Sequence, residues 1–189
     1  MKILVACELS GIVRDAFIAK GHDAMSCDLL PTEAPGPHYL GDVFDVLDRR
    51  WDIIILHPPC TALAVSGNRW YGTGMPKNAD RHKAIEWTMD LYNTAKAMAD
   101  IGVCMENPVG VLPIKPTQYI QPWLFGHGET KKTGLWLHNL PRLKSTDIVK
   151  GREQRIWKMG PSAERSKLRS MTYQGIADAM ANQWGQLYN

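Results

Sequence analysis

Two short stretches carry side chains that could do chemistry, and each follows an apolar run. In "WDIIILHPPC" a thiol, Cys60, stands directly behind a Pro-Pro pair, and in "VCMENP" a carboxylate, Glu106, stands just before Asn-Pro. A rigid turn that presents one thiol is what positioning a nucleophile requires. The competing interpretations are a small buried hydrophobe for the thiol and a loop carboxylate for the acid. Cys104, inside the apolar run, is expected to be a core residue.

Alternating strands and helices must position these groups. Apolar runs predict strands at 2–8, 22–30, 51–56, 103–108 and 133–140, and helical spacing predicts helices at 12–21, 79–102 and 175–187. Residues 31–42 are rich in proline and glycine and predict a loop. This order indicates an α/β fold, a single domain over 1–189 with a mostly parallel sheet. Cys60 and Glu106 should therefore reach the same sheet edge.

A glycine turn follows the first predicted strand. It contains Glu8, Ser10 and Gly11, and acids follow at Asp28 and Asp42. In an open α/β sheet, ligands bind beyond the carboxyl ends of the strands, and an acid about 20 residues on can bind ribose hydroxyls. The turn is not GxGxxG, so a nucleoside-type cofactor without a pyrophosphate fits better than a dinucleotide. An ordinary strand–helix turn with a surface aspartate is the alternative.

Composition narrows the classes of protein. The net charge of +3 permits an anionic partner without demanding one. The four cysteines form no CxxC pair, which argues against a zinc or thioredoxin-like site, and we expect no metal. No apolar run approaches the ~18 residues of a membrane span, and "MKILVACELSG" is too quickly broken for a signal peptide. These features predict a cytoplasmic protein without membrane contact.

The order of the motifs resembles that of the DNA (cytosine-5-)-methyltransferases, and in particular of short phage-encoded members. Pro-Pro-Cys and Glu-Asn-Pro resemble the family's Pro-Cys loop and Glu-Asn-Val motif. "LFGHGETKKTGLWL" is similar to its basic motif, with Glu129 in the place of a glutamine and with Lys131 and Thr133 where arginines are usual. Residues 171–189 resemble the final motif, which packs back on the cofactor site.

The resemblance implies a Rossmann-like fold that binds S-adenosyl-L-methionine and methylates carbon 5 of cytosine in DNA. The residues implied to bind the cofactor are Glu8, Ser10, Gly11, Asp28, Asp42 and Pro58. Cys60 would attack carbon 6 as a thiolate, which requires a lowered pKa. Glu106 would hold a proton on N3, which requires a raised pKa, and Lys131 would contact the cytosine carbonyl.

A base in duplex DNA must be flipped out of the stack to be reached. The segment 61–83 suits a mobile loop that closes over it, although a plain solvated loop is the alternative. The polar and basic residues expected to contact nucleic acid are Ser66, Asn68, Arg69, Lys77, Arg152, Arg155 and Arg169.

The chain departs from the family pattern between the basic motif and the final one. Only a reduced basic region, 144–168, stands where a recognition domain is usual. Three explanations are open. The recognised DNA sequence is short and loosely specified, a partner or second subunit supplies the specificity, or the substrate is not duplex DNA. The alternatives are the same chemistry on RNA or a free cytosine nucleotide, and an inactive protein that binds S-adenosylmethionine or nucleic acid. The expected setting is a bacterial or phage-infected cytoplasm.

Overall fold

A seven-stranded sheet runs through the computed structural model in the order β3-β2-β1-β4-β5-β7-β6. The structure describes residues 1–160 and 162–187. The strands are β1 (Lys2–Ala6), β2 (Asp23–Asp28), β3 (His38–Leu40), β4 (Trp51–Leu56), β5 (Ala99–Pro108), β6 (Gln118–Ile120) and β7 (Thr133–His138). Strands β1 to β5 are parallel to one another, and β7 runs antiparallel to both β5 and β6. The predicted mostly parallel α/β sheet is confirmed.

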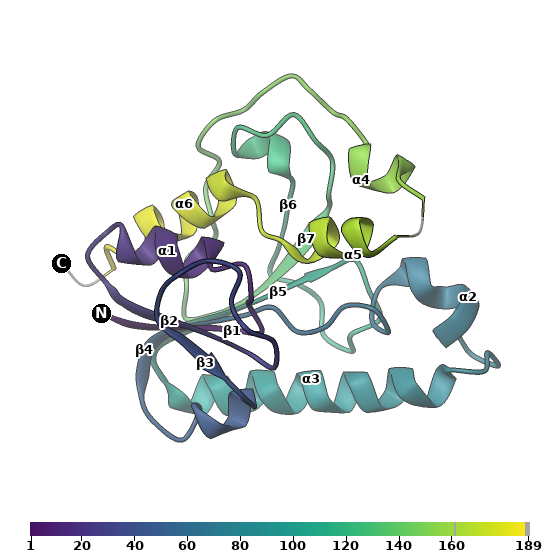
Figure 1. The fold of residues 1–189 in the computed structure, drawn as a ribbon, viewed down its shortest axis with the longest axis horizontal. Helices are drawn as coiled ribbons and strands as arrows, with labels where there is room; N and C mark the ends of the chain where they lie inside the picture. The colour runs from purple at the N-terminus through teal and green to yellow at the C-terminus, as the bar shows by residue number, and fades with distance from the viewer. Residues whose placement is uncertain (161, 188–189) are drawn as a thin grey trace.

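Helices cover both faces of the sheet. They are α1 (Ile12–Ile18), α2 (Asn68–Tyr71), α3 (Asn78–Met98), α4 (Arg155–Lys158), α5 (Ala163–Ser170) and α6 (Gln174–Trp184). The pair α1 and α6 packs on one face and the long α3 lies on the other (Figure 1). No helix within the described residues is both long and apolar enough to cross a membrane.

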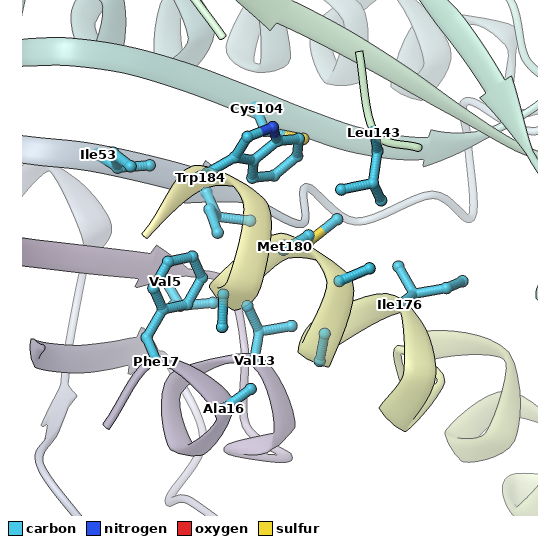
Figure 2. Packing of buried hydrophobic residues seen from close by; sticks show 14 of the residues in the cluster. Val5, Val13, Ala16, Phe17, Ile53, Cys104, Leu143, Ile176, Met180 and Trp184 are labelled. Carbon is cyan, nitrogen blue, oxygen red and sulfur yellow. The ribbon is translucent and has the colours of Figure 1, made fainter. Parts of the chain in front are cut away.

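The core beneath α1 and α6 depends on small residues. Ala16 of α1 and Ala177 and Ala181 of α6 are buried, and their short side chains let the two helices approach closely. Trp184 is fully buried at the end of α6, where it packs on the sheet and its indole N–H donates to the carbonyl of Pro141 at 3.0 Å (Figure 2). Cys104 is fully buried in this core, as expected for a structural cysteine.

The sheet order reverses between β1 and β4, which lie side by side although β2 and β3 separate them in the chain. At such a switch point the connections leave in opposite directions and open a crevice beyond the carboxyl ends of the strands. The segment after β1 and the segment after β4 both begin here. These segments contain the glycine turn and the Pro-Pro-Cys turn, so the predicted functional residues share this edge.

Short elements were missed from the sequence. The predicted loop at 31–42 contains β3, and the basic region 144–168 contains α4 and the start of α5. β3 and α4 have only three and four residues and do not complete a hydrophobic period, so their pattern is not distinct from a loop. Residue 161 of that region and residues 188 and 189 of the predicted C-terminal motif lie outside the described residues.

A buried arginine fixes the loop after β2, and the sequence did not indicate it. Arg14 lies on α1 with no exposed surface, although a charged residue is rarely fully buried. Its guanidinium donates to the carbonyls of Ala34 and Pro35 at 3.2 and 3.1 Å and to the hydroxyl of Ser26 at 3.2 Å. The loop that borders the strand ends is therefore tied to α1.

We expect Arg14→Ala to lower the free energy of unfolding by about 2–5 kcal/mol, because it leaves a void beside α1, the buried Ser26 hydroxyl without its donor and two partly buried carbonyls unpaired. Denaturant unfolding followed by circular dichroism measures this. Arg49→Ala is the control, because Arg49 is exposed and a surface change of this kind is usually within about 0.5 kcal/mol. A loss below about 1 kcal/mol for Arg14→Ala would contradict the assigned role.

Candidate active site

Reactive side chains form a row across the central strands at the switch point. The sheet register places the residues that directly follow β1 and β4 level with the end of β5. The three side chains of the row are Cys7 after β1, His57 after β4 and Glu106 on β5. The backbone N–H of His57 donates to the carbonyl of Ala6 at 2.9 Å, which extends the pairing of β1 and β4 by one residue. Because the row is built from neighbouring parallel strands, its geometry is fixed by the sheet itself.

His57 and Glu106 are in direct contact. Nδ1 of His57 lies 3.1 Å from Oε2 of Glu106, and the two side chains are only 7% and 14% exposed. Burial raises the pKa of Glu106, but the hydrogen bond from His57 and the nearby positive charge of Lys131 outweigh it, so the pKa lies below its ordinary value. Glu106 is therefore a carboxylate at neutral pH, and the expectation of a raised pKa is wrong for this state.

Cys60 follows His57 after the two prolines, Pro58 and Pro59. The side-chain amide of Asn107 donates to the carbonyl of Pro58 at 2.9 Å and so ties the turn to the end of β5. Burial raises the pKa of the Cys60 thiol, and the charges of Arg169 and Lys131 oppose this only in part. The expected lowered pKa is therefore not present in this state. The thiol keeps its proton at neutral pH.

Cavities surround this row. The inner cavity, of about 80 Å³, is lined by His57, Cys60, Glu106, Asn107, Lys131 and Arg169 among others. The front cavity, of about 290 Å³, is lined by residues that include Glu8, Ser10, Asp28, Cys60 and Arg169. The side cavity, of about 300 Å³, is lined by residues that include Asp28, Asp42, Val43 and Trp87. The inner and front cavities share His57, Cys60 and Arg169, so a ligand in one lies beside the other.

The predicted cofactor residues divide into two kinds. Asp28 borders both the front and side cavities and Asp42 borders the side cavity, so these acids face space in which a ligand could lie. Glu8 is buried, and its carboxylate accepts from the backbone N–H groups of Val13 and Arg14 at 2.8 and 3.3 Å. Glu8 therefore holds the start of α1 in place.

The remaining predicted cofactor residues shape the backbone. Ser10 lines the front cavity and donates to Glu8 at 3.2 Å. Gly11 has a φ of +73°, and a Cβ there would lie 2.5 Å from the guanidinium of Arg14, so only glycine fits. Pro58 lines the inner cavity. Segment 171–172 crosses the front cavity just before α6.

Residues expected to contact nucleic acid lie in different places. Arg69 and Lys77 are exposed on and after α2, with their charges over the rings of Trp70 and Tyr71. Arg152 is exposed and stacks over Trp123 at 3.7 Å, whereas Arg155 pairs with Glu129 at 3.0 Å. Ser66 and Asn68 are exposed at the start of α2, and Ser66 accepts from Arg169 at 3.5 Å. Arg169 itself lines the inner cavity, so it faces Cys60 rather than a remote surface.

The segment after Cys60 is not a plain loop. The guanidinium of Arg81, which is buried on α3, donates to the carbonyls of Ala62 and Ala64 at 2.7 and 3.3 Å and to the side chain of Asn68 at 2.8 Å. The stretch nearest the thiol is therefore tied to a long helix. The expectation of a mobile loop is not supported for 61–68, and the exposed tip at 73–77 is the part without such ties.

His57 and Asn107 are the residues that sequence reasoning missed. Both flank predicted functional residues, and both are buried polar groups in a position where a strand ends at a proline. The available signal was the type of residue, because neither His nor Asn is favoured in an apolar strand end. Each retains a buried atom without a hydrogen-bond partner among the described residues, Nε2 of His57 and Oδ1 of Asn107.

Comparison with known proteins gives a likeness in structure only. No family model and no curated protein matches the sequence. Among solved structures 31 chains match. One of them, described as a candidate DNA modification methyltransferase encoded within a prophage of E. coli, superposes with a TM-score of 0.48 at 11% identity, over 72% of this chain and 46% of the other. The chain thus spans less than half of that protein, and a likeness of this size assigns no activity.

Proposed function

We propose that the protein has a Rossmann-like methyltransferase fold and transfers a methyl group from S-adenosyl-L-methionine to carbon 5 of cytosine in DNA through a covalent adduct of Cys60. The observation that carries the proposal is the inner cavity. It brings a thiol after β4, a carboxylate from β5 and the cations Lys131 and Arg169 to one space beside the front cavity. This set of groups is what a nucleophilic attack on an electron-poor ring requires.

The side and front cavities support the cofactor assignment. Asp28 at the end of β2 can accept hydrogen bonds from ribose hydroxyls, and Asp42 can accept from an adenine amino group, since both border the side cavity. Trp87 of α3 and Val43 add apolar surface there, which suits a purine ring. When bound, S-adenosylmethionine would supply an electrophilic methyl group. Cys7, His57 and Cys60 line the front cavity, next to that space.

The chain's own residues would then act on the base. The Cys60 thiolate adds to carbon 6, and carbon 5 gains the electron density needed to take the methyl group. Glu106 supports the proton on N3, and Lys131 and Arg169 offer positive charge to the carbonyl oxygen. A base then removes the carbon-5 proton, and the released electron pair expels Cys60 and restores the ring. The inner cavity of about 80 Å³ has no room for duplex DNA, so DNA would have to present a single cytosine flipped out of the stack.

A trapping experiment tests the proposal. We expect incubation with S-adenosylmethionine and an oligonucleotide that contains 5-fluorocytosine to yield a covalent adduct on Cys60, because fluorine blocks the last proton loss. Intact-protein and peptide mass spectrometry would identify the adduct and its residue. Parallel arms with DNA, RNA and free 5-fluorocytidine nucleotides test the substrate, because phosphate contacts from Arg69 and Lys77 favour a polymer.

Each result is decisive for a part of the proposal. An adduct with DNA on Cys60 supports it in full. An adduct only with RNA or only with a nucleotide keeps the chemistry and overturns the assignment of DNA as substrate. Absence of any adduct in the presence of bound S-adenosylmethionine would favour an inactive binding protein instead.

A further inference from the structure

The resting site holds its proton on the wrong group for the proposed reaction. Burial raises the pKa of the Cys60 thiol, so the nucleophile carries a proton that it must lose. The pKa of Glu106 is lowered, so the acid lacks the proton that it must give to N3. A cytosine adduct needs the opposite arrangement at both residues. Any residue that contacts one of these side chains and lines the same cavity as the other is therefore placed to correct both at once.

His57 has that place. It lines the inner and front cavities together with Cys60, and it contacts Glu106 through Nδ1 at 3.1 Å. Because Glu106 is a carboxylate, Nδ1 must carry the hydrogen that joins them, and a neutral imidazole then has a bare lone pair on Nε2. This Nε2 is buried and has no hydrogen-bond partner among the described residues. A buried acceptor without a donor is costly, and it indicates a site kept for a transient partner.

Charged groups surround His57 in the inner cavity. Glu106 on β5 is the only acid among the residues that line this cavity, where Lys131 lies before β7 and Arg169 on α5. The two cations favour a thiolate at Cys60, and the carboxylate in contact with the imidazole favours the passage of a proton through it.

From this geometry, and resting on the proposed function, we infer that His57 relays the proton of the Cys60 thiol to Glu106, from which it reaches N3 of the cytosine. The S–H bond of Cys60 breaks as sulfur bonds to carbon 6, and Nε2 of His57 takes the proton. The hydrogen on Nδ1 passes to the Glu106 carboxylate, and the carboxyl group then protonates N3. The thiol has added across the ring, and no net charge has been created.

The relay explains why the nucleophile and the acid come from neighbouring strands. His57 and Glu106 are level across β4 and β5, and the prolines return Cys60 to the same cavity. The structure has no hydrogen bond between Sγ of Cys60 and Nε2, so the first transfer follows a rotation of the Cys60 side chain. Catalytic hydrogen bonds commonly tighten only when the substrate is bound.

His57→Asn tests the relay, because the asparagine amide can still donate to Glu106 from the position of Nδ1 but has no group in place of Nε2. We expect alkylation of Cys60 by iodoacetamide at pH 7, followed by peptide mass spectrometry, to be clearly slower than in the unmodified protein. We expect methyl transfer to fall by ~10²-fold or more and added imidazole to restore part of it. His82→Asn, on the exposed face of α3, is the control and should change neither rate.

A measurement on the unmodified protein guards against a variant that fails to fold. The ¹⁵N chemical shifts of His57 should show the tautomer with hydrogen on Nδ1 and a bare Nε2. Hydrogen on Nε2 instead, or unchanged alkylation and methyl transfer in folded His57→Asn, overturns the relay. If the unmodified protein methylates no cytosine substrate, the proposed function fails, and alkylation together with the tautomer still decides whether His57 takes the thiol proton.

Discussion

Cys60→Ala is expected to abolish methyl transfer to cytosine and to leave the binding of S-adenosylmethionine nearly unchanged. The alanine removes the atom that forms the covalent bond. Cys7 is the other thiol that lines the inner cavity, but burial raises its pKa to about 12, so it is a poor substitute as nucleophile. The cofactor would lie mainly against Asp28 and Asp42, which do not depend on the thiol. Isothermal titration beside transfer of a tritiated methyl group separates binding from chemistry, and we expect a Kd within about threefold.

The matched control is Cys104→Ala. Cys104 is a cysteine of the same strand as Glu106 but is fully buried in the core, so its loss should cost about 1 kcal/mol of stability and leave turnover in place. Turnover that persists in Cys60→Ala would rule out the covalent route. A large loss of cofactor affinity in Cys60→Ala would instead show that the thiol shapes the cofactor site.

The sequence predicted the parts of the fold that bury much apolar surface. The run at 51–56 is continuously apolar and the long segment that became α3 has helical spacing, and both match the structure closely. β5 begins at Ala99, within the predicted helix, because the helix ends and the strand starts without a loop between them. Nothing local marks such a boundary, since the register with β4 is a tertiary effect.

The sequence predicted that Cys60 and Glu106 would reach one edge of the sheet, but it indicated neither His57 and Asn107 beside them nor the protonation of the two groups. Strand ends with prolines pointed to Cys60 and Glu106, because the carboxyl ends of parallel strands share an edge. The states of these two groups depend on residues far apart in the chain, such as Lys131 and Arg169, and on how deeply each is buried. Burial and through-space charge arise only in the folded molecule, so spacing along the sequence does not reveal them.

Glu106→Gln is expected to lower kcat by about 10²–10⁴-fold, because glutamine keeps the size of the side chain but can neither receive nor give a proton. Its amide oxygen can still accept from Nδ1 of His57, so the contact between β4 and β5 should survive. The double variant with His57→Asn should lose little more than either single variant, because both changes interrupt one relay. Single-turnover methyl transfer by all four proteins measures this cycle.

Stability gives an independent readout of the same carboxylate. The pKa of Glu106 lies below its ordinary value of 4.5, so the ionised group favours the folded state above that pH and loses this contribution as the pH falls through the lowered pKa. The unmodified protein should therefore exceed Glu106→Gln in stability at pH 7, and the difference should shrink on acidification. Glu86→Gln, on the exposed face of α3, is the control and should show no such trend.

The kinetic cycle has its own contrary outcome. Losses of kcat that simply multiply in the double variant of His57→Asn and Glu106→Gln would mean that His57 and Glu106 act in separate steps.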